Sequence, residues 1–316
     1  MSVPVALVAG GSRGLGLELA AELGRSGSQV VVCARSADEL DRARDWLAAA
    51  GIAAETRVCD VSDREAVADL AAEVERTVGP IETVLCVAGV IQVAPYLSTS
   101  VEDFEQSINT MLWGPINVVR ATLPAMRRRG RGNIGIITSI GGVVSVPHLL
   151  PYSTAKFGAV GFSQGLRAEL AGSGISVTTV IPGLMRTGSQ QRAQFGGQAA
   201  LEYAWFAPAA SLPLLSISSQ RAARIIVRKV LAGRPTVILT PAAKVAVRLN
   251  GLSPGLVTGV LGLAKRLLPR PPGEAVDTGT VPGWAAERRL SSPVVRALTA
   301  LGRRAAARLN QAEAAE

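Results

Sequence analysis

The stretch AGGSRGLG, residues 9–16, stands between an apolar run and the start of an amphipathic helical pattern. Gly10, Gly14 and Gly16 allow a tight turn in which a phosphate can approach the amides of a helix N-terminus. A glycine-rich triplet alone is a weak signal, but the strand–turn–helix context strengthens it. The turn therefore predicts a dinucleotide-binding site near the start of the chain.

The pattern that follows this turn predicts the fold. Short β-rich runs alternate with amphipathic helical patterns up to about residue 240, which is typical of a parallel sheet with helices on both faces. The strand candidates are residues 3–9, 29–34, 52–58, 81–87, 132–139, 174–181 and 235–239. We expect an α/β, Rossmann-type, doubly wound sheet of about seven parallel strands, forming one domain over residues 1–240.

Beyond residue 240 the composition changes. Residues 241–268 are apolar, dotted with basic residues and interrupted by Pro254 and several glycines, and we predict a helical extension there. Residues 269–287, rich in Pro and Gly, are predicted to form a flexible linker. Residues 288–316 are predicted to form a basic amphipathic helix that begins after an N-cap at Ser292. Its apolar stripe would be Val294, Leu298, Leu301, Ala305 and Leu309.

The formal net charge of +9 is distributed unevenly: residues 1–220 carry −2 and residues 221–316 carry +11. Such asymmetry indicates an anionic partner for the C-terminal tail. Amphipathic segments rich in Arg and Leu, too short to span a bilayer, fit an anionic membrane surface. The alternative is that residues 241–268 cap the substrate pocket or an oligomer interface, while the last helix packs on the body.

Composition also argues against several classes of protein. Aromatic residues make up only 4%, so we expect no nucleic-acid partner, and the basic run 127–132 is interpreted as a solvated helix end. His148 is the only histidine, which argues against zinc and against a serine hydrolase at the G-x-S-x-G match of residues 161–165. We therefore predict no metal. Three cysteines without paired spacing, and an N-terminus without a secretory signal, indicate a cytoplasmic protein.

The end of the second predicted strand bears on the choice of cofactor. An NAD site usually has an Asp or Glu there to bind the ribose 2′-hydroxyl. This chain has Ala34 and Arg35 instead. Arg35, with Arg13 in the glycine turn, could pair with a 2′-phosphate. We therefore predict NADP(H).

The segment PYSTAKFG, residues 151–158, places Tyr152 and Lys156 four positions apart in a helical pattern, so both lie on one helix face. A free phenol has a pKa of about 10. An adjacent ammonium, together with a positive nicotinamide, is expected to lower that pKa and make the phenol an efficient acid and base near neutral pH.

With AGGSRGLG, CVAG at 86–89, Asn109, Ser139 and YSTAK at 152–156, the chain resembles the short-chain dehydrogenase/reductase family over about residues 3–240. The resemblance implies an NADP(H)-dependent oxidoreductase that moves a hydride between the nicotinamide and a carbonyl or secondary alcohol. It implies that Tyr152 is the acid and base and Lys156 its partner. Ser139 would bind the substrate oxygen, and Asn109 would hold a water that links the lysine to solvent.

The resemblance also implies a set of cofactor-binding residues. These are Gly10, Ser12, Arg13, Gly14, Leu15, Gly16, Arg35, Asp60, Val61, Ala88, Gly89, Tyr152, Lys156, Pro182, Gly183 and Thr187. Ala9, Cys86 and Val87 depart from the family pattern, at positions that brace the site and do not react. Family members commonly form dimers or tetramers through the helix that carries the Tyr/Lys pair, so a homodimer or homotetramer is expected.

Residues 184–215 lie where this family has its substrate lid. Their apolar content, which includes Phe195, Tyr203, Trp205, Phe206, Leu212 and Leu214, favours an apolar or lipid-like substrate, although core packing explains about half of them equally well. His148 fits either the substrate mouth or an ordinary loop. Two alternatives remain open: a 3-oxoacyl-carrier-protein-type reductase, and a non-catalytic NADP(H)-binding sensor or scaffold.

Overall fold

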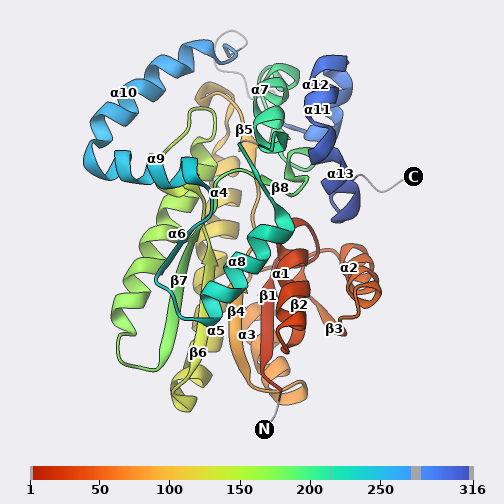
Figure 1. Cartoon of the computed structure of the whole chain (residues 1–316), viewed down its shortest axis with the longest axis vertical. Coiled ribbons are helices and arrows are strands. Elements are labelled where there is room, and N and C mark those ends of the chain that lie inside the picture. Colours follow the sequence, from red (N-terminus) through yellow and green to blue (C-terminus); the bar gives the residue numbers. More distant parts are fainter. Residues whose placement is uncertain (1–2, 214, 272–278, 313–316) are drawn as a thin grey trace.

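The computed structural model describes residues 3–213, 215–271 and 279–312 (Figure 1). Seven strands form a parallel sheet in the order β11-β7-β6-β4-β1-β2-β3, which confirms the predicted Rossmann-type fold. Their bounds are β1 Val5–Ala9, β2 Gln29–Ala34, β3 Ala54–Val58, β4 Ile81–Cys86, β6 Gly132–Ile137, β7 Ile175–Ile181 and β11 Thr236–Ile238. The strand order reverses between β1 and β4, which is where a ligand crevice opens in such sheets.

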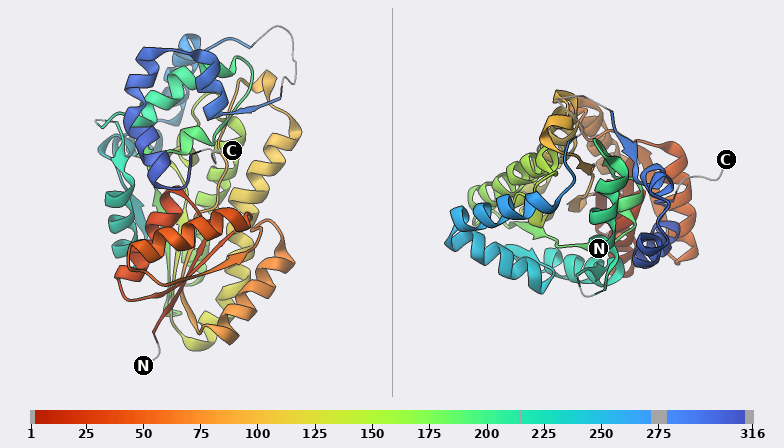
Figure 2. Two further views of the ribbon diagram at one scale, coloured as in Figure 1. Left: turned by 90° about the vertical axis from the view of Figure 1, so that its right-hand side faces the viewer. Right: turned by 90° about the horizontal axis from the view of Figure 1, so that it is seen from above.

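Helices cover both faces of the sheet (Figure 2). On one face α1 (Gly14–Arg25), α2 (Ala37–Ala49) and α8 (Ser219–Leu231) pack on β1 and β2 in a buried apolar cluster. On the other face lie α3 (Arg64–Thr77), α5 (Gly114–Arg129) and α6 (Leu150–Glu169). The helix α4 (Val101–Ile108) packs against α6 and continues into a π-helical turn, Asn109–Trp113. These two apolar layers hold the strand ends, and therefore the crevice, in place.

A third apolar cluster lies above the strand ends and contains the predicted lid. It is built from α7 (Ala199–Ser211), α11 (Gly283–Leu290) and a small sheet of β5 (Gln92–Val93), β9 (Gln194–Phe195) and β12 (Val281–Pro282). A second small sheet pairs β8 (Met185–Arg186) with β10 (Ile217–Ser218).

The predicted linker, residues 269–287, needs correction. Its residues 272–278 lie outside the described residues, but residues 281–287 form β12 and the start of α11. Val281 pairs with Phe195, and Ala286 is fully buried. Gly283 passes so close to Gln190 that a Cβ there would lie 1.8 Å from its carbonyl oxygen. Specific packing, which Pro and Gly content does not reveal, orders this part of the segment.

The predicted final helix also differs from the structure. Residues 288–312 contain the end of α11 and two short helices, α12 (Pro293–Leu298) and α13 (Ala300–Arg308). Ser292 accepts a hydrogen bond from the Val295 amide at the N-terminus of α12. Ala305 and Leu309 are buried against the body, whereas Val294 is 65% exposed. The apolar stripe is therefore divided, and its second half belongs to the core.

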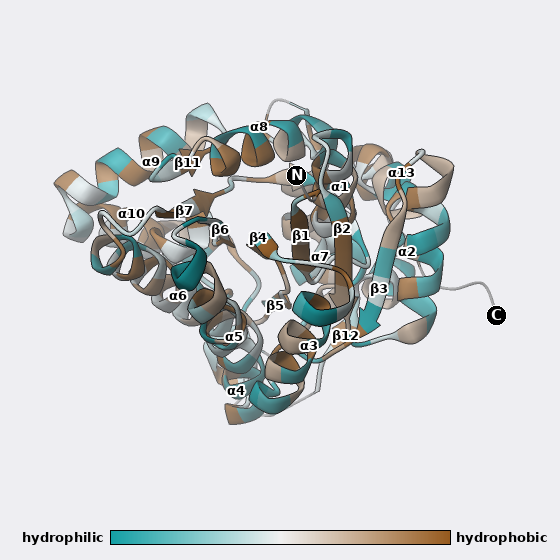
Figure 3. Cartoon of the chain, turned by 90° about the horizontal axis from the view of Figure 1, so that it is seen from below, coloured by the Kyte–Doolittle hydropathy of each residue, from teal (hydrophilic) through white to brown (hydrophobic). Residues whose placement is uncertain are grey.

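Residues 241–267 form α9 (Pro241–Leu252), α10 (Pro254–Ala264) and a 3-10 turn, Lys265–Leu267. Both helices project from the edge of the molecule, away from α11–α13 (Figures 1 and 2). Seen from below, they form the outer margin, with hydrophobic turns along them (Figure 3). Among the described residues, no helix combines the length and hydropathy needed to cross a bilayer.

Candidate active site

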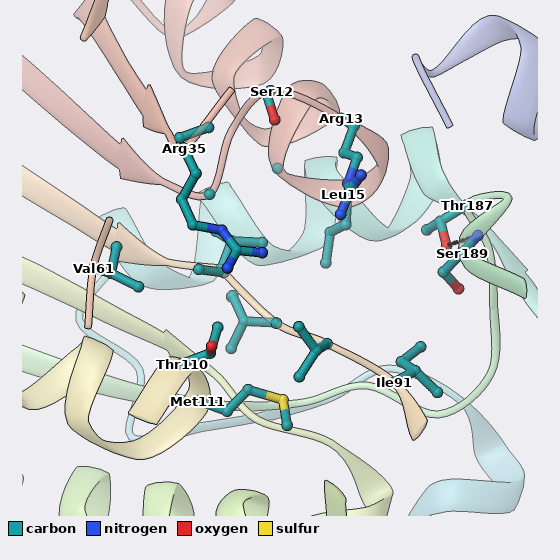
Figure 4. A pocket seen from close by; sticks show the side chains of 18 of the residues that line it. Ser12, Arg13, Leu15, Arg35, Val61, Ile91, Thr110, Met111, Thr187 and Ser189 are labelled. Atoms are coloured by element: carbon teal, nitrogen blue, oxygen red, sulfur yellow. Dashed lines mark hydrogen bonds between the residues drawn. The ribbon is translucent and has the colours of Figure 1, made fainter. Parts of the chain in front are cut away.

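A crevice with a cavity of about 300 Å³ lies at the carboxyl ends of the central strands (Figure 4). Most of the predicted cofactor residues line it: Gly10, Ser12, Arg13, Leu15, Gly16, Arg35, Asp60, Val61, Ala88, Gly89, Tyr152, Lys156 and Thr187. Gly14, Pro182 and Gly183 do not line it. Pro182 instead accepts a hydrogen bond from the Ile140 amide, so it supports the loop that follows Ser139.

The glycine turn is shaped by close backbone approaches. Gly10 has φ +92°, and a Cβ there would lie 2.4 Å from the Ala88 nitrogen. A Cβ on Gly16 would lie 2.1 Å from the Gly10 carbonyl oxygen. Arg13, the N-cap of α1, provides no side-chain cap. Among the described residues, the amides of Leu15 and Gly16 have no protein acceptor, so they are left for a phosphate.

Two arginines, one from the glycine turn and one from the end of β2, point into the crevice (Figure 4). Arg13 Nη1 lies 2.9 Å from Glu39 Oε1, and Ser12 Oγ donates to Glu39 Oε2 at 3.1 Å. Arg35 Nη1 lies 3.8 Å from Asp60 Oδ2. Burial lowers the pKa of Arg13, and the Glu39 carboxylate opposes that shift. The arrangement can bind a phosphate, but it already contains a carboxylate that competes for Arg13.

Glu39 is a site residue that the sequence reasoning missed. Ser36 and Glu39 have the spacing of a helix-capping box, and the Glu39 amide does donate to Ser36 Oγ. In a capping box the glutamate side chain would bond the backbone amide of Ser36 at the N-terminus of the helix. In the structure its carboxylate instead faces Ser12 and Arg13, a tertiary contact that local spacing cannot reveal.

Tyr152, Ser139 and Lys156 come together beside the crevice. Ser139 follows β6, and its hydroxyl acts on Tyr152, in the first turn of α6, in the direction that lowers the pKa of the phenol. Ser139 Oγ also accepts from the Gly141 amide at 3.0 Å. Lys156 Nζ lies 5.9 Å from the centroid of the Tyr152 ring and donates to the Ile137 carbonyl at 2.8 Å. The three side chains predicted to carry the chemistry are therefore assembled in one place.

The expected lowering of the Tyr152 pKa is not found in the chain by itself. Burial raises the pKa of the phenol, and this effect outweighs the opposing hydrogen bond with Ser139. Burial also lowers the pKa of Lys156 to about 8, although a coulombic interaction with Cys86 opposes this shift. Because Lys156 is itself destabilised as a cation and is directed towards Ile137, it does not acidify the phenol alone.

Asn109 does not line the crevice, although the π-helical turn that it begins contacts α6. Its side chain is exposed, and it begins the π-helical turn. The next two residues, Thr110 and Met111, are buried and line the crevice (Figure 4). A π-helical turn changes which of its residues face inward. The sequence spacing between Asn109 and the other motifs therefore did not indicate that Thr110 and Met111 face the crevice. The water-holding role of Asn109 therefore stays a prediction.

The predicted lid packs against Tyr152. Tyr152, Trp205 and Phe206 are partly buried against a cluster in which Phe195 and Tyr203 are fully buried. Leu212 is partly buried, and Leu214 lies outside the described residues. The apolar residues of the predicted lid are therefore of two kinds, as the sequence indicated. Some are core residues, and the others are partly exposed near the site.

His148 is a buried loop residue, 6% exposed. Its Nδ1 lies 2.9 Å from Oε1 of Glu202, a carboxylate with no exposed surface that also accepts from Trp205 Nε1 at 2.7 Å. The pair joins the loop before α6 to α7. His148 does not line the crevice, and Glu202 is a partner that the sequence gave no signal to find.

Comparison with known proteins decides the family. A family model described as short chain dehydrogenase matches residues 4–195, more than half of the chain. The chain belongs to this family. The solved structure of an actinorhodin polyketide ketoreductase variant with NADPH superposes with a TM-score of 0.67 at 29% identity, covering 76% of this chain and 97% of that one.

Curated relatives of this short-chain dehydrogenase act on different kinds of molecule, as their names state. It is 35% identical to gluconate 5-dehydrogenase of Gluconobacter oxydans over 187 residues, 59% of this chain and 73% of that protein. It is 35% identical to 3-dehydrosphinganine reductase TSC10A of Arabidopsis thaliana over 181 residues, 56% of this chain and 54% of that protein. Matches to curated relatives cover between 14% and 73% of their length. These names support an oxidoreductase but do not select a substrate.

Proposed function

We propose that this chain is an NADP(H)-dependent oxidoreductase that transfers a hydride between the nicotinamide and a carbonyl or secondary alcohol of an apolar, lipid-like substrate. The observation that carries this proposal is the group formed by Tyr152, Ser139 and Lys156 beside the crevice. A non-catalytic sensor does not need a tyrosine, a serine and a lysine gathered at that position. Replacement of Tyr152 by Phe tests the proposal.

The chemistry divides between the cofactor and the protein. The nicotinamide supplies or accepts the hydride and, when oxidised, carries a positive charge. As the carbonyl oxygen gains negative charge, Tyr152 donates a proton to it and Ser139 stabilises it by a hydrogen bond. Lys156, which bonds the Ile137 carbonyl, lies beside the phenol ring and favours the phenolate left behind.

The preference for NADP(H) is supported by Arg13 and Arg35, which line the crevice from α1 and β2, and by the NADPH held by the related polyketide ketoreductase. Arg35 is only loosely paired with Asp60, so its guanidinium is available to a phosphate. Arg13 must exchange its bond with Glu39 for the same phosphate, or share it. Of the two carboxylates near these arginines, Glu39 competes more strongly than Asp60, because it lies 2.9 Å from Arg13 whereas Asp60 lies 3.8 Å from Arg35.

Arg35→Asp is expected to weaken NADPH binding by about 10- to 100-fold while leaving NADH binding little changed, because a hydrogen bond to a charged group contributes about 1.5–3 kcal/mol. Dissociation constants for both nucleotides, from the quenching of protein fluorescence, measure this. Arg44→Asp, on the exposed part of α2, makes the same change in net charge away from the crevice and is the control. An unchanged ratio of NADPH to NADH affinity would exclude Arg35 as the 2′-phosphate ligand.

The pKa of Lys156 predicts a pH dependence. With a folded-state pKa of about 8 in place of the usual 10.5, the amine is protonated below pH 8 and loses its charge as pH rises through that value. The kcat/KM for NADPH, which reports on the free enzyme, should therefore be constant below about pH 7 and fall above about pH 8. Lys244→Met, an exposed lysine of α9, should leave this profile unchanged. A wild-type profile that is flat up to pH 9.5 would show that the charge on Lys156 is not required.

The apolar character of the substrate is supported by the cluster of α7 and β9 that packs on Tyr152. The relatives are named for gluconate and for 3-dehydrosphinganine, and these names do not agree on a polar or an apolar substrate. The proposal of an apolar substrate therefore rests on the local packing. The second candidate is a 3-oxoacyl-carrier-protein-type reductase, which the likeness to a polyketide ketoreductase favours. Activity on carrier-bound 3-oxoacyl thioesters, but not on free long-chain ketones, would select it.

We also place this protein in the cytoplasm, on an anionic membrane surface, and assign the contact to α9 and α10. In α10 no residue is buried, and Leu256, Val260 and Leu263 are 56–67% exposed. Residues 241–271 contain five cations, Lys244, Arg248, Lys265, Arg266 and Arg270, and no acidic residue. Like charges oppose pairing with a second copy of this surface, whereas anionic headgroups complement it.

We also propose a homodimer or homotetramer that forms through α6. Phe157 on that helix is 44% exposed and is available for such a contact.

The membrane assignment is tested by cosedimentation with vesicles of phosphatidylcholine, alone or mixed with phosphatidylserine. The wild-type chain should sediment with the mixed vesicles, and Leu256→Gln/Leu263→Gln should abolish this. The matched control Val294→Gln/Leu298→Gln alters two exposed apolar residues of α12 and should sediment normally. If only the α12 variant loses vesicle binding, the membrane contact lies in the last helices and not in α9 and α10. If the wild-type chain does not bind the vesicles, the membrane assignment is wrong.

A further inference from the structure

The segment that follows α13, residues 309–312, lies on the glycine turn, far from it in sequence. The Gly14 amide donates to the Leu309 carbonyl at 2.9 Å, and Leu309 is fully buried. Asn310 Nδ2 donates to the carbonyls of Ser12 and Glu39, both at 3.0 Å, and Asn310 Oδ1 accepts from Arg42 Nε at 2.8 Å. Figure 2 shows α13 next to α2 and the start of α1. The segment is therefore joined to the turn that the cofactor would contact.

The same segment is held on the other side of the crevice. Arg192 donates to the carbonyls of Gln311 and Ala312 at 3.2 and 3.0 Å. On the side of the glycine turn, Arg308 at the end of α13 pairs with Glu18 of α1 at 2.9 Å, and this carboxylate is 2% exposed. The contact is close enough that a Cβ on Gly188 would lie 2.3 Å from the Ala306 Cα. Thr187, which lines the crevice, precedes that glycine, so the segment connects both walls of the cofactor site.

Gln311 is the residue of this segment that faces the crevice. It lines the cavity and is 6% exposed. Its Nε2 is beside Gly14, where a Cβ would lie 2.4 Å from it. Leu15 and Gly16 also line the cavity, and their backbone amides belong to the same first turn of α1 as Gly14. A carboxamide donor next to free helix N-terminal amides is a combination that binds phosphate oxygens.

We propose that Gln311 is a cofactor-binding residue whose carboxamide donates to the diphosphate of the dinucleotide, and that residues 309–312 hold it in that position. The proposal rests on the dinucleotide site of the proposed function, not on its hydride chemistry. The segment takes the Gly14 amide and leaves those of Leu15 and Gly16 open among the described residues, so it lies beside the phosphate position and does not fill it. Docking of the segment therefore raises the affinity for the cofactor, and the bound cofactor stabilises the docked segment by the same free energy.

The test compares Gln311→Ala with Gln164→Ala, an exposed glutamine of α6 outside the crevice. Because the diphosphate is common to both nucleotides, Gln311→Ala should weaken NADPH and NADH by the same factor, about 10- to 100-fold. Calorimetric titration gives both dissociation constants without any substrate. Gln164→Ala should bind as the wild type does. Unchanged binding by Gln311→Ala, or tighter binding as expected of a segment that blocks the site, overturns the proposal.

Hydrogen exchange of the wild-type chain provides a second measurement that does not depend on the variant folding. NADPH should slow amide exchange in peptides covering residues 300–312, because the cofactor stabilises the docked segment. Exchange there that is unchanged or faster with NADPH overturns the coupling. If the wild-type chain binds neither nucleotide, the proposed function fails together with this inference. Normal wild-type binding with an unaffected Gln311→Ala overturns this inference alone.

Discussion

Replacing Tyr152 by Phe is expected to lower turnover by about 10²–10⁴-fold, the usual contribution of a positioned general acid. Phe keeps the ring that packs against the apolar cluster of α7 and β9, and it removes only the hydroxyl. NADPH should therefore bind nearly as it does to the wild type. The loss should appear in kcat and in kcat/KM equally, because the interaction is made in the transition state.

The measurement is NADPH oxidation with straight-chain ketones of graded length, and the ketone that the wild type reduces fastest is used for the variants. Tyr96→Phe is the control, since Tyr96 is 65% exposed and lies outside the crevice. Full activity in Tyr152→Phe would show that another group donates the proton. A similar loss of activity in Tyr96→Phe would show that the effect is not specific to the site.

Gly16→Ala is expected to have the second largest effect, the loss of most cofactor affinity. The added Cβ would lie 2.1 Å from the Gly10 carbonyl oxygen and 2.9 Å from the Gly11 Cα, both backbone atoms that cannot rotate away. The turn must open to accommodate it, at a cost of about 1–3 kcal/mol or more. If that cost falls on the cofactor-binding conformation, NADPH affinity drops by about 10- to 100-fold.

The matched control is Gly161→Ala, in the middle of α6, where no atom lies within 4 Å of the added Cβ. There the substitution should stabilise the helix by up to about 1 kcal/mol and leave NADPH affinity unchanged. Thermal unfolding and NADPH titration of both variants separate the two effects. Wild-type NADPH affinity in Gly16→Ala would mean that the turn does not bind the diphosphate.

The features predicted correctly from the sequence are those carried by local pattern. The period of the apolar residues predicted the seven parallel strands, because each buried strand must be covered by a helix on either face. The glycine turn, Ser139, Tyr152 and Lys156 follow strand ends or share a helix face. Their proximity therefore follows from the topology of a parallel sheet.

The features missed or misplaced depend on contacts between distant segments. The carboxylate of Glu39 reaches Arg13 from the first turn of α2, and Leu309 reaches Gly14 from near the other end of the chain. Burial, which no pattern of residues quantifies, raises the pKa of Tyr152 in the chain by itself, so the predicted lowering depends on the bound cofactor. In each case the deciding interaction is tertiary.

The central claim is that Tyr152 exchanges a proton with the substrate and that the charge of the oxidised nicotinamide makes this possible near neutral pH. Its most direct test is the ultraviolet titration of tyrosine ionisation, wild type minus Tyr152→Phe, with and without NADP⁺. The free chain should titrate above the usual pKa of tyrosine, because burial raises the pKa of Tyr152. With NADP⁺ bound the midpoint should move well below that usual value. A midpoint that NADP⁺ does not lower would contradict the role assigned to Tyr152.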